Sequence, residues 1–160
     1  MTTHSFWGIV QEDWAGLSAE QSITLPPFEQ PIPVFLGEEL LEEGEEYDVS
    51  TGPLDDYAAT FQAFRAEAPR LIAALRDQAF ARYLEVYAHY YENPAKSGEP
   101  ALGLTTAEQH FAYMQDVRLL RVSSEQVIRL VIEYDLDPEH GLEAKFVGNV
   151  LIDLGCMAET

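Results

Sequence analysis

The sequence predicts a single α+β domain spanning residues 1–160, with an antiparallel sheet and helices packed on one side of it. Segments rich in β-branched and aromatic residues fill the first 36 positions and return after about position 118. Between them, apolar residues recur every three or four positions, which is the spacing of an amphipathic helix. Strands, then helices, then strands, with neither a linker nor an internal repeat, are typical of α+β domains.

Three short strands are expected in the N-terminal part of the chain, at residues 6–11 (FWGIVQ), 21–25 (QSITL) and 32–36 (IPVFL). The connections between them are too short for crossovers, so the pairing is expected to be antiparallel. Proline cannot donate a ladder hydrogen bond, and it therefore favours edge strands or corners. Four prolines fall in this part of the chain: Pro26, Pro27, Pro31 and Pro33.

Two long helices are expected in the middle of the chain. The first is marked by apolar residues at helical spacing, namely Leu54, Tyr57, Ala58, Phe61 and Phe64. Pro69 is expected to mark its end and the first turn of a second helix, which runs to about Tyr91. The apolar stripe of the second helix comprises Leu71, Ile72, Leu75, Ala79, Tyr83, Val86, Tyr87 and Tyr90. The tyrosines of this helix are expected to pack in the core or in an interface.

The last third of the chain predicts a short helix and then strands. Thr105 and Glu108 fit a capping box for a helix that runs to about Val117. Strands are expected at residues 119–122 and 126–136, followed by two strands joined at Gly148-Asn149, a pair that suits a primed hairpin turn. Phe146 is expected on the buried face of that hairpin, and the lone histidine His110 at the surface or packed rather than binding a ligand.

The charge of the chain limits its partners. The net charge is −19, and residues 1–64 hold thirteen acidic residues without a lysine or arginine. Such a field disfavours nucleic acid and anionic lipid and favours basic partners. Nine of the acids lie in residues 37–56. This stretch is either a solvated loop leading into a helix or an anionic surface that docks a basic partner.

The sequence favours a cytoplasmic protein. Cys156 is the single cysteine, so an internal disulfide is excluded, and a small buried apolar side chain is its expected role. The N-terminus has no basic region followed by an apolar run, as a signal peptide would. No apolar run approaches the length of a membrane helix, and we expect neither a metal nor another cofactor.

The segment YDLDPEHGL, residues 134–142, raises the possibility of a metal or acid–base site. Asp135, Asp137 and Glu139 fit the first acidic positions of a calcium loop, but the glycine comes one place late and position twelve is a phenylalanine. Glu139 and His140 are adjacent and point to opposite faces of an extended chain. We therefore interpret the segment as a corner between strands, in which His140 can form a hydrogen bond. Pro138 would direct the chain, Asp137 would bind backbone amides and Gly141 would adopt a positive φ.

Two stretches resemble a family of uncharacterised bacterial domains. The segment DPEHGLEAKFVGNVLIDLG is similar to its C-terminal signature, and DWAGLSAEQSITLPPFEQPIPVFLG to its Trp-x-Gly start. The signature residues in this chain are Trp14, Gly16, Asp137, His140 and Gly141, and Glu143 stands where the family usually has glycine. Members often lie near polymorphic toxin genes and many are suspected immunity proteins. The resemblance thus implies a protective binding protein, with no catalytic residues to transfer.

We therefore expect an immunity-type protein that is not an enzyme and that neutralises a bacterial toxin by occluding its active or substrate-binding site. The expected partner is the cognate toxin, a basic protein such as a nuclease. The expected contacts are Glu38, Glu39, Glu42, Glu43, Glu45, Glu46, Tyr47 and Asp48. Two alternatives remain open at this point. One is a small metal-dependent hydrolase using Asp135, Asp137, Glu139 and His140, and the other is a non-catalytic domain that associates with itself.

Overall fold

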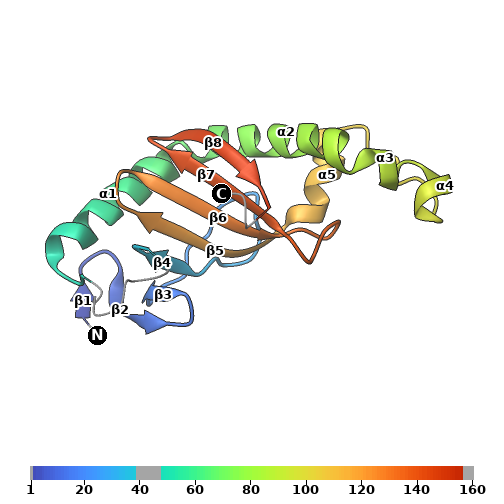
Figure 1. Cartoon of the computed structure of the whole chain (residues 1–160). Coiled ribbons are helices and arrows are strands. Elements are labelled where there is room, and N and C mark those ends of the chain that lie inside the picture. Colours follow the sequence, from blue (N-terminus) through green and yellow to red (C-terminus); the bar gives the residue numbers. More distant parts are fainter. Residues whose placement is uncertain (1, 39–47, 157–160) are drawn as a thin grey trace.

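The computed structural model describes residues 2–38 and 48–156. Within these residues an eight-stranded sheet has a spatial order that follows the sequence order from β1 to β8 (Figure 1). The strands are β1 (Thr2–His4), β2 (Gly8–Asp13), β3 (Gly16–Ala19), β4 (Val34–Leu36), β5 (Asp116–Ser123), β6 (Val127–Glu133), β7 (Leu142–Val147) and β8 (Val150–Gly155). The helices are α1 (Thr51–Ala66), α2 (Ala68–Val86), α3 (Ala88–Tyr91), α4 (Pro94–Ser97) and α5 (Ala107–Phe111), with a 3₁₀ turn at Ala112–Met114. The predicted α+β class is confirmed.

The sheet is antiparallel except at one place, where β4 runs parallel to β5. All five helices lie between these two strands in the sequence, and a parallel pair requires such a long connection. The chain leaves the sheet after β4, passes through the helices and returns beside β4 as β5. The parallel pair therefore joins the N-terminal strands to the C-terminal strands in one continuous sheet.

The N-terminal strands differ in part from the prediction. Residues 21–25 do not form a strand; only Ile23 pairs, through two backbone hydrogen bonds with Ile32 of 3.0 and 2.7 Å. The surrounding prolines lack amide hydrogens, which limits the pairing to this bridge. The chain instead turns at Trp14-Ala15 and forms β3 from Gly16 onward.

The two long helices begin and end close to the predicted positions. The buried positions of α1 are those of its apolar stripe, and Pro69 lies in the first turn of α2 as expected. However, α2 ends at Val86, and a separate short helix carries Tyr90. Val86 and Tyr90 are exposed, so the buried stripe of α2 ends at Tyr83. Figure 1 shows the reason: beyond that point the helical segment extends past the end of the sheet.

The capping box of α5 is shifted by one residue from the predicted pair. The Thr106 hydroxyl accepts a hydrogen bond from the Gln109 amide, and the Gln109 side chain accepts one from the Thr106 amide. Thr105 precedes this cap, and Glu108 lies within the first turn. The helical segment ends at Met114 rather than near Val117 because β5 begins at Asp116.

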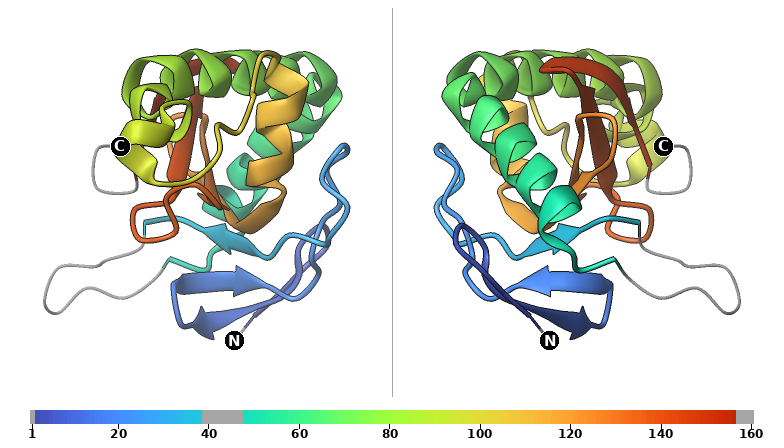
Figure 2. Two further views of the ribbon diagram at one scale, coloured as in Figure 1. Left: turned by 90° about the vertical axis from the view of Figure 1, so that its right-hand side faces the viewer. Right: turned by 90° about the vertical axis from the view of Figure 1, so that its left-hand side faces the viewer.

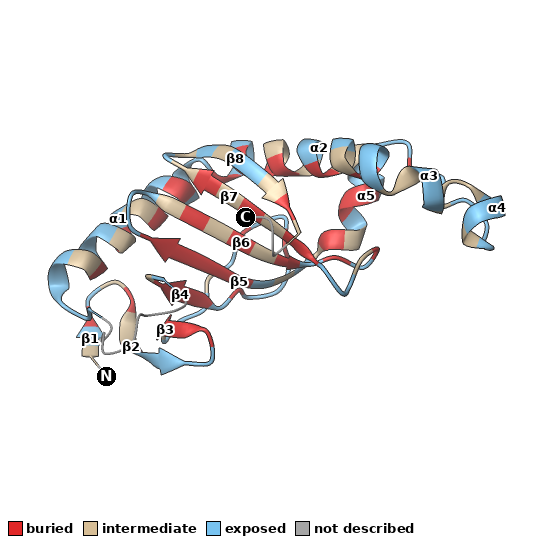
Figure 3. Ribbon diagram, in the orientation of Figure 1, coloured by how far each residue is buried: buried red, intermediate tan, exposed pale blue. Residues whose placement is uncertain are grey.

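The core lies between one face of the sheet and the helices. Side chains of β6 and β7 alternate in burial, whereas the last five residues of β5 are all buried. α1 and α2 cover the face of the sheet that is buried most completely (Figures 2 and 3). Phe64 of α1 and Phe146 of β7 meet there edge-to-face, with ring centroids 5.1 Å apart. Gly148 and Asn149 have φ values of 55° and 61°, which confirms the predicted primed turn that sets the register of Phe146.

Replacement of Phe146 by alanine is expected to lower the free energy of unfolding by about 3–5 kcal/mol, because it removes a fully buried ring and leaves a cavity beneath α1. Urea unfolding measures the effect. Val150→Ala in the same hairpin is the control, since Val150 is 56 % exposed and its truncation is expected to cost well under about 1 kcal/mol. Equal losses from the two substitutions would contradict the assigned register.

Candidate functional site

The segment at residues 134–142 forms the corner between β6 and β7, as the sequence predicts. One Asp137 carboxylate oxygen accepts the Tyr87 hydroxyl at 2.6 Å, and the other is hydrogen-bonded to His140 Nδ1 at 2.9 Å. The Gly141 amide donates to the Asp137 carbonyl at 2.8 Å, and Gly141 has a φ of 63°. Tyr91 donates to the carbonyl of Leu136. Tyrosines of the helical segment thus fasten this corner to the domain.

The acidic residues of this corner do not gather at one point. Burial alone would raise the pKa of Asp137, but hydrogen bonds from Tyr87 and His140 outweigh it and lower that pKa. Asp135 and Glu139 are exposed and take no part in this network. Within residues 2–38 and 48–156, no three His, Cys, Asp or Glu side chains are placed so that they could hold a metal ion.

His110 belongs to a buried aromatic cluster. Its Nε2 is hydrogen-bonded to the Tyr134 hydroxyl at 2.5 Å, and its ring centroid lies 5.2 Å from that of Tyr83. Burial lowers the pKa of His110 to about 4 and raises the pKa of Tyr134. The ring is therefore neutral at pH 7. Nδ1 is buried without a hydrogen-bond partner among the described residues, so protonation there would place an uncompensated charge in the core.

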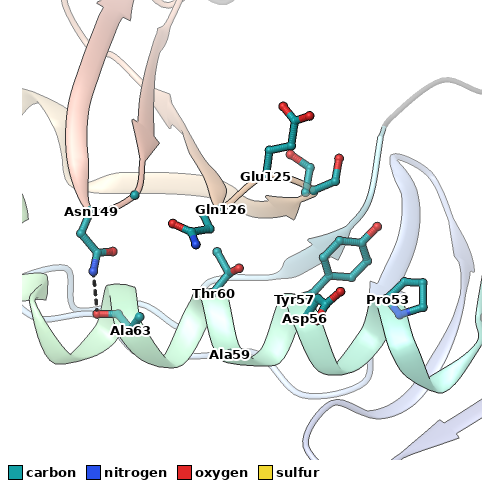
Figure 4. Close-up of a pocket in the computed structure, with 12 residues that line it drawn as sticks. Pro53, Asp56, Tyr57, Ala59, Thr60, Ala63, Glu125, Gln126 and Asn149 are labelled. Carbon is teal, nitrogen blue, oxygen red and sulfur yellow. Dashed lines mark hydrogen bonds between the residues drawn. The ribbon is translucent and has the colours of Figure 1, made fainter.

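A hollow of about 610 Å³ lies between α1 and two hairpin turns (Figure 4). We call it the α1 pocket. Its lining comes from α1, from the turn between β5 and β6, and from the turn between β7 and β8. The lining residues are Pro53, Asp56, Tyr57, Ala59, Thr60, Ala63, Ser123, Ser124, Glu125, Gln126, Gly148 and Asn149.

Hydrogen bonds hold the walls of the α1 pocket in place. The Gly148 amide donates to the carbonyl of Gln126 at 3.2 Å, which joins the two hairpin turns. The Asn149 side-chain amide donates to the Ala63 carbonyl at 3.4 Å, as Figure 4 shows. The Arg70 guanidinium donates to the Asn149 carbonyl at 3.1 Å from the start of α2. The pocket is therefore formed in advance of any partner, since both turns are fastened to each other and to the helices.

The electrostatic character of the α1 pocket is negative. Asp56 and Glu125 are its charged lining residues. Burial raises the pKa of the Tyr57 hydroxyl, and the nearby carboxylates of Glu38, Asp48 and Asp56 raise it further. Glu38 and Asp48 flank residues 39–47 of the acidic stretch, and the effect of their charges on Tyr57 indicates that both lie near the pocket.

The structure covers the predicted contact residues only in part. Glu38 and Asp48 are described and lie near Tyr57, whereas the other predicted contacts lie outside the described residues: Glu39, Glu42, Glu43, Glu45, Glu46 and Tyr47. Sequence reasoning assigned Tyr57 to a helical core stripe and did not identify Glu125 or Gln126. The signal for Glu125 was the polar segment between the two predicted strands, which predicts a turn but not what the turn faces. Gln126 was predicted as the first residue of the second strand, whereas β6 begins at Val127.

The two residues of the Trp-x-Gly signature lie at the turn between β2 and β3. Trp14 is 59 % exposed, and its ring contacts the edge of Phe35 with the centroids 5.0 Å apart. Gly16 opens β3 with a φ of 112°, a conformation that side-chain-bearing residues rarely adopt. Phe35 belongs to a small apolar cluster separate from the main core, with Ala15 and Leu119. Trp14 therefore marks the face of the sheet that the helices do not cover.

None of the helices in the described part of the chain has the length and apolar character needed to cross a membrane. The chain belongs to the family described as a domain of unknown function, DUF6985, whose model matches residues 5–158. Neither a curated protein nor a solved structure matches it significantly. The match fits the expectation of an uncharacterised domain family that covers nearly the whole chain.

His110 is expected to make the fold sensitive to acid. Its pKa is about 4 in the folded chain against an ordinary value of 6.5, so the unfolded chain binds the proton first as the pH falls. The contribution of His110 therefore leaves the free energy of unfolding unchanged above about pH 6.5 and lowers it between pH 6.5 and 4, by up to about 1.4 kcal/mol per pH unit. Urea unfolding at several pH values measures this dependence.

The His110→Gln variant removes this titration and is expected to show a shallower loss of stability between pH 6.5 and 4. His89→Gln is the control, because His89 is exposed on α3 and its replacement is expected to leave the pH dependence as it is. Carboxylates titrate alike in all three proteins and cancel in the comparison. Identical slopes for wild type and His110→Gln would show that the burial of His110 has no such effect.

Proposed function

We propose that this member of the DUF6985 family is an immunity-type binding protein, which neutralises a basic bacterial toxin by occluding its active or substrate-binding site. The chain would act in the cytoplasm and without catalysis of its own. A nuclease is the toxin class that fits best, because a groove that binds nucleic acid is lined by cationic side chains.

The observation that carries this proposal is the position of the α1 pocket. The hollow of about 610 Å³ is lined by Asp56 and Tyr57, and the charges of Glu38, Asp48 and Asp56 raise the pKa of Tyr57. A cationic side chain of the partner that enters the pocket would find carboxylates at its rim and an aromatic ring beside it. Tyrosines that become buried near the centre of an interface frequently contribute much of its binding energy.

The net charge of −19 would act before contact is made. Opposite charges steer two proteins together and raise association rates to roughly 10⁸–10⁹ M⁻¹s⁻¹ at low salt. The same field repels nucleic acid, so the protein would compete for the toxin's groove without binding the toxin's substrate. Occlusion rather than chemistry is therefore the mechanism that the charge distribution favours.

The proposal is tested with the product of the neighbouring gene, co-expressed with this chain and isolated as a complex. Stopped-flow association is then measured from about 20 to 500 mM NaCl, where the association rate is expected to fall by one to three orders of magnitude. Toxin activity in the presence of a stoichiometric amount of this chain measures occlusion. A rate that is independent of salt, or a toxin that stays active in the complex, would contradict the mechanism.

The role of the α1 pocket is tested with the double variant Asp56→Lys and Glu125→Lys. It is expected to weaken binding by at least about 100-fold, since it reverses the sign of both charged lining residues. The matched control is Glu85→Lys with Glu99→Lys, which changes the net charge equally at exposed positions towards the far end of the helical segment (Figure 1). Equal losses in both double variants would mean that only net charge matters.

A further inference from the structure

The two signature motifs, which are far apart in the sequence, border neighbouring hollows on the same part of the sheet. One hollow, of about 160 Å³, is bordered by Trp14. The other, of about 280 Å³, is bordered by Pro138 and Gly141 of the corner. Arg118 and Val131 line both hollows, so they are adjacent. We call this surface, defined by Trp14, Arg118, Val131, Pro138 and Gly141, the Arg118 strip. The two hollows are also bordered by three acids, Glu133, Asp135 and Glu143.

Trp14 is held in a fixed position although it is exposed. Its ring contacts Phe35 on one side, and the guanidinium carbon of Arg118 lies 5.0 Å from its centroid. The Trp14 backbone amide donates to the Asp13 carboxylate at 2.8 Å, which fixes the turn. A rigid exposed indole can cover an apolar side chain of a partner with little further loss of conformational entropy.

Arg118 is directed towards Trp14 by an irregularity in the sheet. The register between β5 and β6 shifts between Val117 and Leu119, so that Arg118 is the additional residue of a β-bulge. Bulges commonly redirect a side chain beside a functional site. Here the bulge stacks a guanidinium on an exposed tryptophan between two hollows.

The neighbouring cations on this face are already engaged, whereas Arg118 is not paired with an acid. Arg121 donates to the carbonyls of Ala15 and Gly37, and Arg129 lies 3.7 Å from the carboxylate of Glu143. Among the described residues, Arg118 takes part in no ion pair or hydrogen bond beyond its contact with Trp14. Although the chain has 28 acidic residues, the planar N–H donors of the Arg118 guanidinium can therefore bind a carboxylate of another molecule.

We propose that the Arg118 strip binds an exposed segment of a partner protein in which an acidic side chain adjoins an apolar one. The carboxylate accepts two parallel hydrogen bonds from the Arg118 guanidinium, and the apolar side chain lies on Trp14. Because Glu133, Asp135 and Glu143 border the same hollows, the strip accommodates no more than a single further carboxylate, placed at the guanidinium itself. A nucleic acid strand carries a charge on every phosphate and is repelled far more strongly. This surface is distinct from the α1 pocket and does not depend on its proposed role.

The binding test uses the whole chain and two short peptides, acetyl-Leu-Glu-Leu-amide and acetyl-Leu-Gln-Leu-amide. Trp7 is 2 % exposed and Trp14 is 59 % exposed, so acrylamide quenching of tryptophan fluorescence reports mainly on Trp14. The glutamate peptide is expected to protect Trp14 at concentrations at least about tenfold lower than the glutamine peptide, because hydrogen bonds to a charged group are the stronger ones. Equal protection by the two peptides would overturn the proposal without any variant being made.

Variants then assign the preference to Arg118. Arg118→Gln is expected to abolish the discrimination between the peptides, and Arg118→Lys to reduce it, because lysine lacks the planar fork. The matched control is Arg65→Gln on α1, since Arg65 also lies over an aromatic ring, 5.3 Å from the centroid of Phe61, but away from the strip. Discrimination that survives in Arg118→Gln, or protection by a single-stranded oligonucleotide stronger than by the glutamate peptide, would overturn the assignment.

Discussion

The parallel pairing of β4 with β5 is the constraint on which the rest of the molecule depends. It places Val34 beside Leu120 and Leu36 beside Val122. It thereby joins strands β1 to β4, which precede the described helices in the sequence, to strands β5 to β8, which follow them. Backbone hydrogen bonds extend the pairing at both ends, from Leu120 to the Pro33 carbonyl and from Gly37 to the Val122 carbonyl. Without this contact the N-terminal strands would lack a continuous ladder to the main sheet.

Both candidate surfaces follow from this one contact. After β4, Gly37 has a φ of 77°, and a Cβ at this position would lie 3.5 Å from the Tyr57 hydroxyl, so the chain passes close to α1 at the α1 pocket. On the other face, Arg121 of β5 donates to the carbonyls of Gly37 and Ala15, which brings the turn with Trp14 over β5. The pairing that completes the core thus also sets the position of the acidic stretch and of the exposed tryptophan.

What the sequence predicts well is what neighbouring residues determine. The apolar stripe of α1, the start of α2 at Pro69 and the primed turn at Gly148-Asn149 depend on local spacing and local backbone preference. The cap of α5 was predicted one residue too early, because Thr105 with Glu108 has the same spacing as the observed pair, Thr106 with Gln109. The extent of the strands at the N-terminus depends on partners further along the chain. For this reason the strand predicted at residues 21–25 is found instead at Gly16–Ala19, where it pairs with β2 and β4.

The candidate sites could be predicted even less well than the strands, because their residues come from distant parts of the sequence. Negative charge in the N-terminal half is evident from the sequence, but the α1 pocket combines one helix with two hairpin turns that only the folded sheet brings together. Arg118 could not be identified, because a β-bulge has no local signature and its stacking partner is more than a hundred residues away. Tyr83, Tyr87 and Tyr91 pack against the core as predicted, whereas Tyr90 is exposed. The sequence did not predict that the hydroxyls of Tyr87 and Tyr91 hold the corner that contains Asp137.

The residues of the C-terminal signature motif stabilise the fold and also border a candidate binding surface. Asp137 and His140 satisfy each other and Tyr87, an arrangement in which every removed partner would leave a polar group uncompensated. That network fixes the corner, and the corner in turn presents Pro138 and Gly141 beside Arg118. The α1 pocket lies instead between α1 and the hairpin turns, with carboxylates at its rim. A carboxylate-bearing segment at the Arg118 strip and a cationic side chain at the α1 pocket therefore require opposite charges, and neither ligand competes for the site of the other.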